Sequence, residues 1–247
     1  MERWRSGDSE SPGIDPRNTR ATRWPRVTRF RDRAHAGRLL GERLRACADR
    51  PDVIVLGLPR GGVPVAFEVA KRLRVPLDVF VVRKLGVPGH EELAMGAIAS
   101  GGVRMLNEDV VAMARVSERD VETVTLREEH ELARRERAYR GDRSSPDVAG
   151  RTVILVDDGL ATGATMRAAA AGVRRLDAAA VVVAVPAAAA DTCELLAHEA
   201  DEVVCLTTPE PFHAVGLWYE DFSATTDDEV RALLEEARGW GRRAQAV

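Results

Sequence analysis

Short runs of apolar residues alternate with amphipathic stretches along most of the chain. The run at residues 153–156, Val-Ile-Leu-Val, has no polar face, which is typical of a strand buried on both sides of a parallel sheet. Predicted strands lie at 53–58, 77–82, 153–156, 180–185 and 203–206, and predicted helices at about 30–48, 63–73, 107–115, 117–139, 166–176, 191–197 and 227–234. Strands separated by helices in this way predict an α/β fold with a mostly parallel, twisted sheet flanked by helices.

Two segments interrupt this alternation. Residues 1–25 are polar, with arginines throughout, and we expect a flexible, solvated tail in preference to a contact with nucleic acid or an acidic surface. Residues 85–102 are rich in glycine and are interpreted as a mobile connection, with a two-stranded excursion at 97–99 and 103–106 plausible inside it. The remainder, residues 26–247, is expected to form one domain.

Two further segments have an unusual composition. The helix predicted at 117–139 is charged over most of its surface, so we expect a solvated face with ion pairs. A subunit contact, and with it a homodimer, is the alternative. The densest aromatic group follows residue 207 and includes Trp218, Tyr219 and Phe222. We expect this group to close the carboxyl end of the chain over the core.

Composition and charge narrow the classes of function. The formal net charge of −3 provides no basic field for nucleic acid, and no apolar run approaches the ~20 residues of a membrane span. The three cysteines and five histidines show no metal-type spacing, and we expect a reducing compartment and no disulfides. The amino end lacks the apolar core of a signal peptide, which favours the cytoplasm.

The stretch 153–165, Val-Ile-Leu-Val-Asp-Asp-Gly-Leu-Ala-Thr-Gly-Ala-Thr, combines a strand, an acid pair, a small-residue loop and the start of a helix. A helix amino end attracts phosphate, Gly163 permits close approach of the backbone, and two threonines offer hydroxyl donors. Asp157 and Asp158 would repel phosphate, but they suit sugar hydroxyls or a divalent cation. The stretch therefore predicts a site for a ribose 5′-phosphate.

A second glycine loop is predicted at the same edge of the sheet, where ligands of open parallel sheets gather. Arg60, Gly61 and Gly62 follow the first predicted strand, and an arginine fork suits phosphate oxygens. Taken alone, this loop fits a tight turn with a surface arginine equally well. Arg83 and Lys84 are expected at the carboxyl end of the second predicted strand, facing the same crevice.

The stretch 153–165 resembles the signature of type I phosphoribosyltransferases, which bind phosphoribosyl pyrophosphate (PRPP). It departs at Gly159, where an aliphatic residue is more usual. The resemblance implies that Asp157 and Asp158 hold the ribose 2′- and 3′-hydroxyls, with magnesium bound to them through PRPP or water. The predicted site for the ribose and its 5′-phosphate also includes Gly159, Leu160, Ala161, Thr162, Gly163, Ala164 and Thr165.

The resemblance also implies roles outside this stretch. The predicted pyrophosphate site consists of Arg60, Gly61, Gly62, Arg83 and Lys84. The segment 85–102 would close over the substrate and exclude water, and Glu91 or Glu92 in it is the candidate general base. The segment from about 207 would form a hood that binds the acceptor. Candidates for stacking on an acceptor base are Trp218, Tyr219 and Phe222.

The implied activity is that of a pentosyltransferase of nucleotide metabolism or salvage, in which a nitrogen acceptor displaces pyrophosphate from PRPP. Family members that act on 6-oxopurines carry a proton-accepting Asp where this chain has Ala161, which argues against hypoxanthine and guanine. One alternative is a non-catalytic module on the same fold that senses PRPP or a nucleotide. Another is a different phosphate-transfer or hydrolytic enzyme, which the missing phosphate-loop and nucleophile-elbow motifs argue against.

Overall fold

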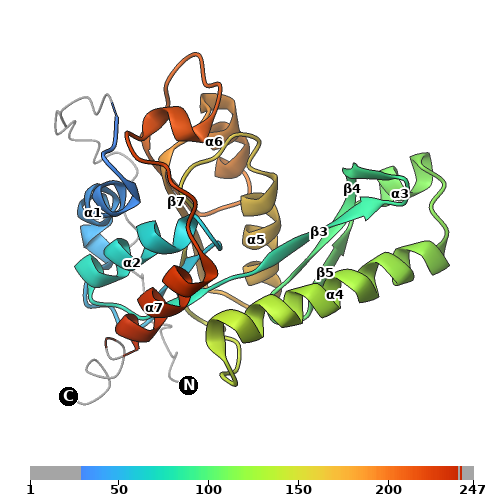
Figure 1. Ribbon diagram of the computed structural model, residues 1–247, viewed down its shortest axis with the longest axis horizontal. Helices are drawn as coiled ribbons and strands as arrows, with labels where there is room; N and C mark the ends of the chain where they lie inside the picture. The colour runs from blue at the N-terminus through green and yellow to red at the C-terminus, as the bar shows by residue number, and fades with distance from the viewer. Residues whose placement is uncertain (1–28, 239, 241–247) are drawn as a thin grey trace, which may run out of the picture.

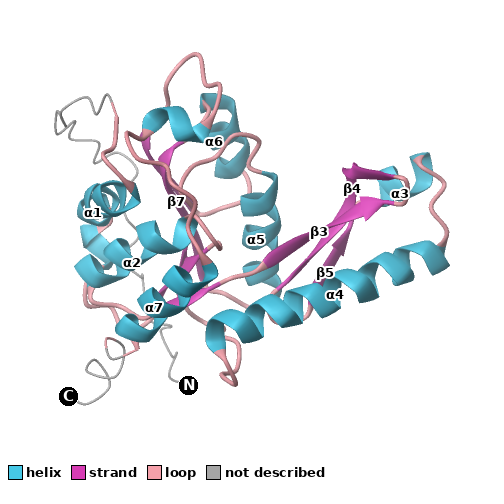
Figure 2. Cartoon of the chain, in the orientation of Figure 1, coloured by secondary structure: helices cyan, strands magenta, loops and turns pink. Residues whose placement is uncertain are grey.

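The computed structural model describes residues 29–238 and residue 240. The tail expected at residues 1–25 lies outside these residues. Figures 1 and 2 show a sheet with helices on both of its faces, and an arm of strands with a long helix that projects from this body. Within the described part of the chain, no helix combines the length and the apolar character that crossing a membrane requires.

Five parallel strands form the central sheet, in the order β2-β1-β6-β7-β8. Because every neighbouring pair is parallel, the carboxyl ends of all five strands meet at one edge. The strands are β1 (Val53–Gly57), β2 (Leu77–Val79), β6 (Thr152–Val156), β7 (Ala180–Ala187) and β8 (Glu202–Thr207). This sheet confirms the predicted α/β class, and β6, which leads into the acid pair, is its middle strand.

Helices cover both faces of the sheet. They are α1 (Arg33–Arg43) and α2 (Gly62–Leu73) on one face, and α5 (Ala164–Arg175) and α6 (Ala190–Ala197) on the other (Figure 1). The side chains of β6 alternate between these layers: Ile154 and Val156 pack with α1 and α2, whereas Val153 and Leu155 pack with α5. Full burial of one such side chain contributes about 1.5–3 kcal/mol. Burial on both faces explains why this run has no polar position.

The arm consists of a second, antiparallel sheet and two helices. Its elements are β3 (Val82–Val87), β4 (His90–Ala99), β5 (Val103–Leu106), α3 (Glu108–Met113) and α4 (Glu118–Arg140). Residues 85–102 are therefore not an irregular connection as expected, because β3 and β4 form a hairpin there. The excursion predicted inside that segment is confirmed, since Ala97 of β4 pairs with Met105 of β5.

Packing explains why the arm is ordered. Leu85 and Met95 are buried in one cluster with Val121 and Leu132 of α4. The glycines of the arm serve close approach rather than mobility. A Cβ atom on Gly86 would lie 2.5 Å from the carbonyl oxygen of Glu91, and one on Gly96 would lie 2.4 Å from that of Met105. Composition alone does not separate these two uses of glycine.

The carboxyl-terminal segment returns across the body. It contains a short 3₁₀ helix, η2 (Val215–Trp218), and the helix α7 (Asp227–Ala237). Val230 and Leu234 of α7 are buried in the same cluster as Val63 of α2 and Tyr139 of α4. This helix therefore joins the base of the arm to the body. A second short 3₁₀ helix, η1 (Arg45–Cys47), follows α1.

Cys193 of α6 and Cys205 of β8 lie side by side and are paired in the structure, with their Cα atoms 7.4 Å apart, which differs from the expectation of no disulfides. The pairing depends on the packing of α6 beside β8, which the spacing of the two cysteines along the chain does not encode. Cys47 is a free, buried cysteine. Burial raises the pKa of its thiol.

Candidate functional site

The acid pair lies at the carboxyl end of the middle strand. Asp157 and Asp158 follow β6 directly and are partly buried. The backbone N–H of Asp158 donates a hydrogen bond of 2.9 Å to Oδ1 of Asp157. Burial, together with the neighbouring charge of Asp158, raises the pKa of the Asp157 carboxyl well above its usual value. Burial also raises the pKa of Asp158, although the Arg33 guanidinium opposes this rise.

The glycine loop after β1 lies against the acid pair. The N–H of Leu58 donates to the carbonyl of Val156 at 2.9 Å, which ties the loop to the end of β6. A Cβ atom on Gly61 would lie 2.0 Å from Oδ2 of Asp158, and one on Gly62 would lie 2.8 Å from Cα of Asp157. A side chain at Gly62 would collide with the backbone, and one at Gly61 would displace the Asp158 carboxylate. The structure therefore brings together the two loops that the sequence singled out.

The amino end of α5 is open. Gly163 has a φ angle of +67°, which glycine adopts without strain, and α5 begins at the next residue. The N-cap residue is Gly163, which has no side chain to accept a hydrogen bond from the first-turn N–H groups. Thr162, Ala164 and Thr165 are exposed. The first-turn N–H groups and the dipole of an uncapped helix favour an anion.

The loop between the acid pair and α5 is anchored on its far side. The N–H of Leu160 donates to the carbonyl of Ala187 at 2.9 Å, at the end of β7. The hydroxyl of Thr192 in α6 donates to the carbonyl of Ala161 at 2.7 Å. Leu160 is itself buried in the core. Backbone groups of this loop are thus held in place before any ligand arrives, which lowers the entropic cost of binding.

The carboxyl-terminal segment covers the acid-pair loop. The hydroxyl of Tyr219 donates to the carbonyl of Asp158 at 2.6 Å. A Cβ atom on Gly159 would lie 2.5 Å from Cγ1 of Val215, so the glycine that departs from the family signature makes room for this segment. The N–H of Phe30 donates to the carbonyl of Trp218, which ties this segment to the chain before α1. We call residues 212–223 the hood.

The three aromatic candidates of the hood differ in access. Tyr219 is buried, which fits the expectation that this group closes the carboxyl end of the chain over the core. Its ring has no open face on which an acceptor base could stack. Trp218 is partly buried beside Phe212, with ring centroids 6.5 Å apart. Phe222 is the most open of the three, at 36% exposure.

Arg33, the first residue of α1, belongs to the site although the sequence analysis missed it. Its Nε and Nη2 atoms both lie 2.8 Å from Oδ2 of Asp158. Its Nη1 donates to the carbonyl of Ser223 at 2.7 Å, and its guanidinium carbon lies 4.0 Å from the centroid of the Phe222 ring. Arg33 and Asp158 are 125 positions apart, and no local pattern around Arg33 indicates this contact.

Arg60 is placed beside the site but points toward α7. Its side chain is about half exposed, and Nη1 lies 4.0 Å from Oδ1 of Asp227. The hydroxyl of Tyr139 donates to the same oxygen at 3.0 Å. An exposed ion pair at this distance contributes little, so Arg60 is free to turn toward an anion.

Arg83 and Lys84 do not stand at the end of a strand of the parallel sheet. Both lie inside β3, in the arm, because the predicted strand at 77–82 ends at Val79 and the chain enters the second sheet. Arg83 Nε donates to Oε2 of Glu128 in α4 at 2.9 Å. Lys84 is exposed and lines a groove of about 570 Å³ that also includes Ala164 at the start of α5.

Glu91 and Glu92 lie near the start of β4 and are exposed. The end of β3 and the start of β4 form the tip of the arm, far from the parallel sheet in Figure 1. The structure does not bring these two glutamates to the acid pair. Their predicted role as general base has no geometric support here.

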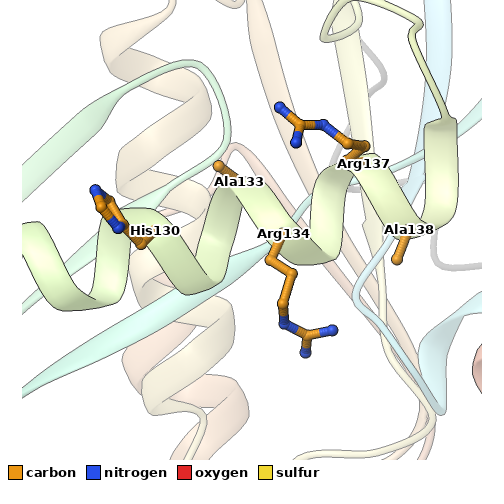
Figure 3. Close-up of a pocket in the computed structure, with 5 residues that line it drawn as sticks. All are labelled: His130, Ala133, Arg134, Arg137 and Ala138. Atoms are coloured by element: carbon orange, nitrogen blue, oxygen red, sulfur yellow. The ribbon is translucent and has the colours of Figure 1, made fainter.

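A further hollow of about 450 Å³ lies on α4, lined by His130, Ala133, Arg134, Arg137 and Ala138. Figure 3 shows that Arg134 and Arg137 leave the helix on opposite sides. Arg134 also donates to Glu131 at 2.7 Å. The basic side chains therefore do not converge on a common ligand, and this surface has the ion-paired character expected of it.

The two carboxylates of the acid pair are too few to bind a metal ion by themselves, but they could share one with a bound ligand. Among the residues described, no group of three His, Cys, Asp or Glu side chains is placed to hold a metal ion. In the part of the chain that the structure describes, Asp157 has no cationic partner, whereas one oxygen of Asp158 is occupied by Arg33. Such a donor set fits Mg²⁺ that arrives with a phosphorylated ligand, because Mg²⁺ commonly uses one or two carboxylates and takes its other ligands from phosphate and water.

The chain is similar to known proteins along most of its length. A family model described as "Phosphoribosyl transferase domain" matches residues 31–220. Over 208 residues the chain is 51% identical to a protein of Mycobacterium tuberculosis, in strains H37Rv and CDC 1551, whose name gives it provisionally as a phosphoribosyl transferase. The match covers 84% of this chain and 47% of that relative. The chain thus spans about half the length of the curated relatives it matches.

The fold also resembles a solved structure. The crystal structure of the protein TT1426 from Thermus thermophilus superimposes with a TM-score of 0.75 at 46% sequence identity. The superposition covers 86% of this chain and 99% of that one. The body and the arm together therefore correspond to nearly all of the Thermus protein.

Proposed function

The chain belongs to the phosphoribosyl transferase domain family, and from this premise we propose that it binds PRPP with magnesium and transfers the phosphoribosyl group to a nitrogen acceptor. Pyrophosphate is the product released. One observation carries the proposal: the acid pair, the glycine loop and the open end of α5 meet at one edge of the sheet. They offer acceptors for hydroxyls beside two places suited to anions.

The sugar and its 5′-phosphate would occupy the first part of this site. In the proposal, carboxylate oxygens of the acid pair accept hydrogen bonds from the ribose hydroxyls. Backbone N–H groups at 163–166 and the hydroxyls of Thr162 and Thr165 donate to the 5′-phosphate. The open amino end of α5 and the anchored loop before it support this assignment.

The pyrophosphate end would be held by the glycine loop. Gly61 and Gly62 allow the backbone to approach within contact distance of the acid pair, and Arg60 supplies a charge beside it. Lys84 can contribute from the arm, because it shares a groove with Ala164. Arg83 is left out of the proposal, since Glu128 already neutralises it.

The chemical step is a displacement at the anomeric carbon. A nitrogen lone pair of the acceptor forms the new C1–N bond while the C1–O bond to pyrophosphate breaks and that oxygen keeps the electron pair. Magnesium bound with PRPP would offset the charge of the leaving pyrophosphate. The protein's share is to position both partners, to place Arg60 near the leaving group, and to keep Asp157 near the sugar as it becomes cationic.

The acceptor would enter under the hood. Phe222, and the part of Trp218 that remains accessible, are proposed to contact it. Ala161 is exposed and carries no group that could accept a proton, which supports an acceptor other than a 6-oxopurine. The proton of the nitrogen nucleophile then passes to water or to a group of the acceptor itself.

A non-catalytic PRPP sensor is the second candidate. The observation that favours it is the reduced cationic shell: Glu128 neutralises Arg83, so of the two cations expected after the second predicted strand only Lys84 remains available. A sensor needs the sugar-phosphate site but has less need of groups that stabilise a leaving pyrophosphate.

One assay separates these candidates. The protein is incubated with PRPP, magnesium and a panel of purine, pyrimidine and other nitrogen acceptors, and pyrophosphate release is measured. The proposal predicts release with at least one acceptor, and slower release from the Asp157→Asn variant at PRPP concentrations that do not saturate it. If no acceptor gives pyrophosphate release but calorimetry shows PRPP binding, the result favours the sensor. If neither release nor binding is found, the result contradicts the proposal.

A further inference from the structure

The two carboxylates of the acid pair have different surroundings. Asp157 accepts one backbone hydrogen bond and has no cation within ion-pair distance among the described residues. Asp158 receives both Nε and Nη2 of Arg33 on a single oxygen, Oδ2. The family signature treats the two acids as a pair, but the structure distinguishes them.

Arg33 is held on three sides. One face of its guanidinium lies over the Phe222 ring, and Nη1 donates to the carbonyl of Ser223. Its side chain is only 12% exposed. Since Phe222 and Ser223 both belong to the hood, the ion pair between Arg33 and Asp158 connects α1, the acid-pair loop and the hood.

The surroundings of Asp158 leave little room for a ligand on Oδ2. A Cβ atom on Gly61 would lie 2.0 Å from this oxygen, so the glycine loop closes one side of it. The backbone carbonyl of the same residue receives the Tyr219 hydroxyl. Asp158 therefore has structural partners both at its carboxylate and at its backbone.

We propose that Arg33 is a positioning residue that gives the two acids different roles. It holds Asp158 against the hood and leaves Asp157 as the main carboxylate that binds the sugar. The part of this inference that concerns the sugar rests on the proposed function. The fastening of the hood does not, because it follows from the contacts alone. Removing either member of a partly buried ion pair leaves the other charge uncompensated.

Melting temperatures test the fastening without any ligand. Arg33→Gln and Asp158→Asn should each lower the melting temperature, and the double variant should melt no lower than the more damaged single variant. Asp157→Asn should not lower it, because asparagine keeps an oxygen for the N–H of Asp158 and removes an uncompensated charge. Arg38→Gln is the matched control, since among the described residues this exposed arginine of α1 forms its one ion pair with Glu68, at 3.4 Å.

Calorimetry with ribose 5-phosphate, and with PRPP and magnesium, tests the division of roles. Asp157→Asn should weaken both ligands by roughly 10- to 100-fold, the expected loss of a hydrogen bond to a charged group. Asp158→Asn and Arg33→Gln should weaken them less, and Arg33→Lys, which keeps the charge but loses the guanidinium fork, should recover part of the affinity. A purely structural role of Arg33 would not show this dependence on charge once the variants are folded.

Three results would overturn the inference. Tighter ligand binding by Arg33→Gln would mean that Arg33 competes for the sugar's place. Equal losses in Asp157→Asn and Asp158→Asn would mean that the pair acts symmetrically. Additive losses of melting temperature in the double variant would remove the fastening. If the wild-type protein binds neither ligand, the proposed function fails, and the melting temperatures still decide whether the hood is fastened.

Discussion

The phenolic oxygen of Tyr219 lies 2.6 Å from the carbonyl oxygen of Asp158 and donates a hydrogen bond to it. This contact joins the hood to the second residue of the acid pair, directly after β6. Because Tyr219 is buried between Phe30 and Phe222, it fixes the hood over the loop rather than offering a face to a ligand. The hood therefore already covers the acid-pair loop before any ligand binds.

A substitution at Gly159 tests whether the hood packs against the acid-pair loop. In Gly159→Ala the new methyl group meets Val215 at 2.5 Å, and overpacking of this kind costs about 1–3 kcal/mol. We expect a lower free energy of unfolding, measured by urea titration. Adding Val215→Ala should recover part of the loss. A double variant less stable than Gly159→Ala alone would show that the hood does not rest on this glycine.

The two tyrosines of the chain predict an unusual alkaline titration. Burial and the hydrogen bond to Asp227 raise the pKa of Tyr139 to about 12. Burial and the charge of Asp158 raise the pKa of Tyr219 as well. Since both folded-state values exceed the value of about 10 in an unfolded chain, the neutral phenols stabilise the fold below pH 10. That stability is lost as the pH rises toward and past about 12.

The measurement is tyrosinate absorbance against pH. The native protein should show almost no phenolate near pH ~10.5, whereas the protein in guanidinium chloride should titrate near pH ~10. Tyr139→Phe should remove the earlier of the two native steps. Half-ionisation of the native protein at pH ~10 would contradict the burial of both rings.

Arg60 and Lys84 are predicted to act on pyrophosphate rather than on the sugar phosphate. Arg60→Ala should weaken pyrophosphate by roughly 10-fold, the scale of one charge-assisted hydrogen bond, and leave ribose 5-phosphate unchanged. Lys84→Ala should act in the same direction. Arg83→Ala is the comparison: it should lower thermal stability, because the buried Glu128 then keeps only Arg127 as an ion-pair partner among the described residues, and it should leave pyrophosphate binding intact. Equal losses for both ligands in Arg60→Ala would remove it from this role.

Much of the fold was predictable because its signals are local. The run before Asp157 is apolar on both faces, so a buried parallel strand follows from β6 alone. The small-residue loop before Ala164 likewise marks the start of α5. The sequence also predicts that the loop at Gly61 and the acid pair lie at the same edge of a parallel sheet, whereas the pairing of β1 with β6, which brings Gly61 against Asp158, comes from the structure.

The errors arose where tertiary contacts decide. The glycines in 85–102 predict an irregular connection, whereas Gly86 and Gly96 allow the strands of a hairpin to approach closely. Arg83 and Lys84 were placed at the wrong strand end because the break after Val79 depends on packing against α4. The pair of Arg33 and Asp158 and the disulfide between Cys193 and Cys205 join segments whose proximity exists only in the folded chain.

The central claim is that the acid pair and the amino end of α5 hold opposite ends of one phosphorylated sugar. Calorimetric titration of ribose 5-phosphate into the wild-type protein and into Asp157→Asn tests it most directly, with ribose and inorganic phosphate as the two half-ligands. We predict that ribose 5-phosphate binds the wild type more tightly than either half and loses at least about 10-fold in the variant. Equal affinity of ribose 5-phosphate for the two proteins would contradict the account.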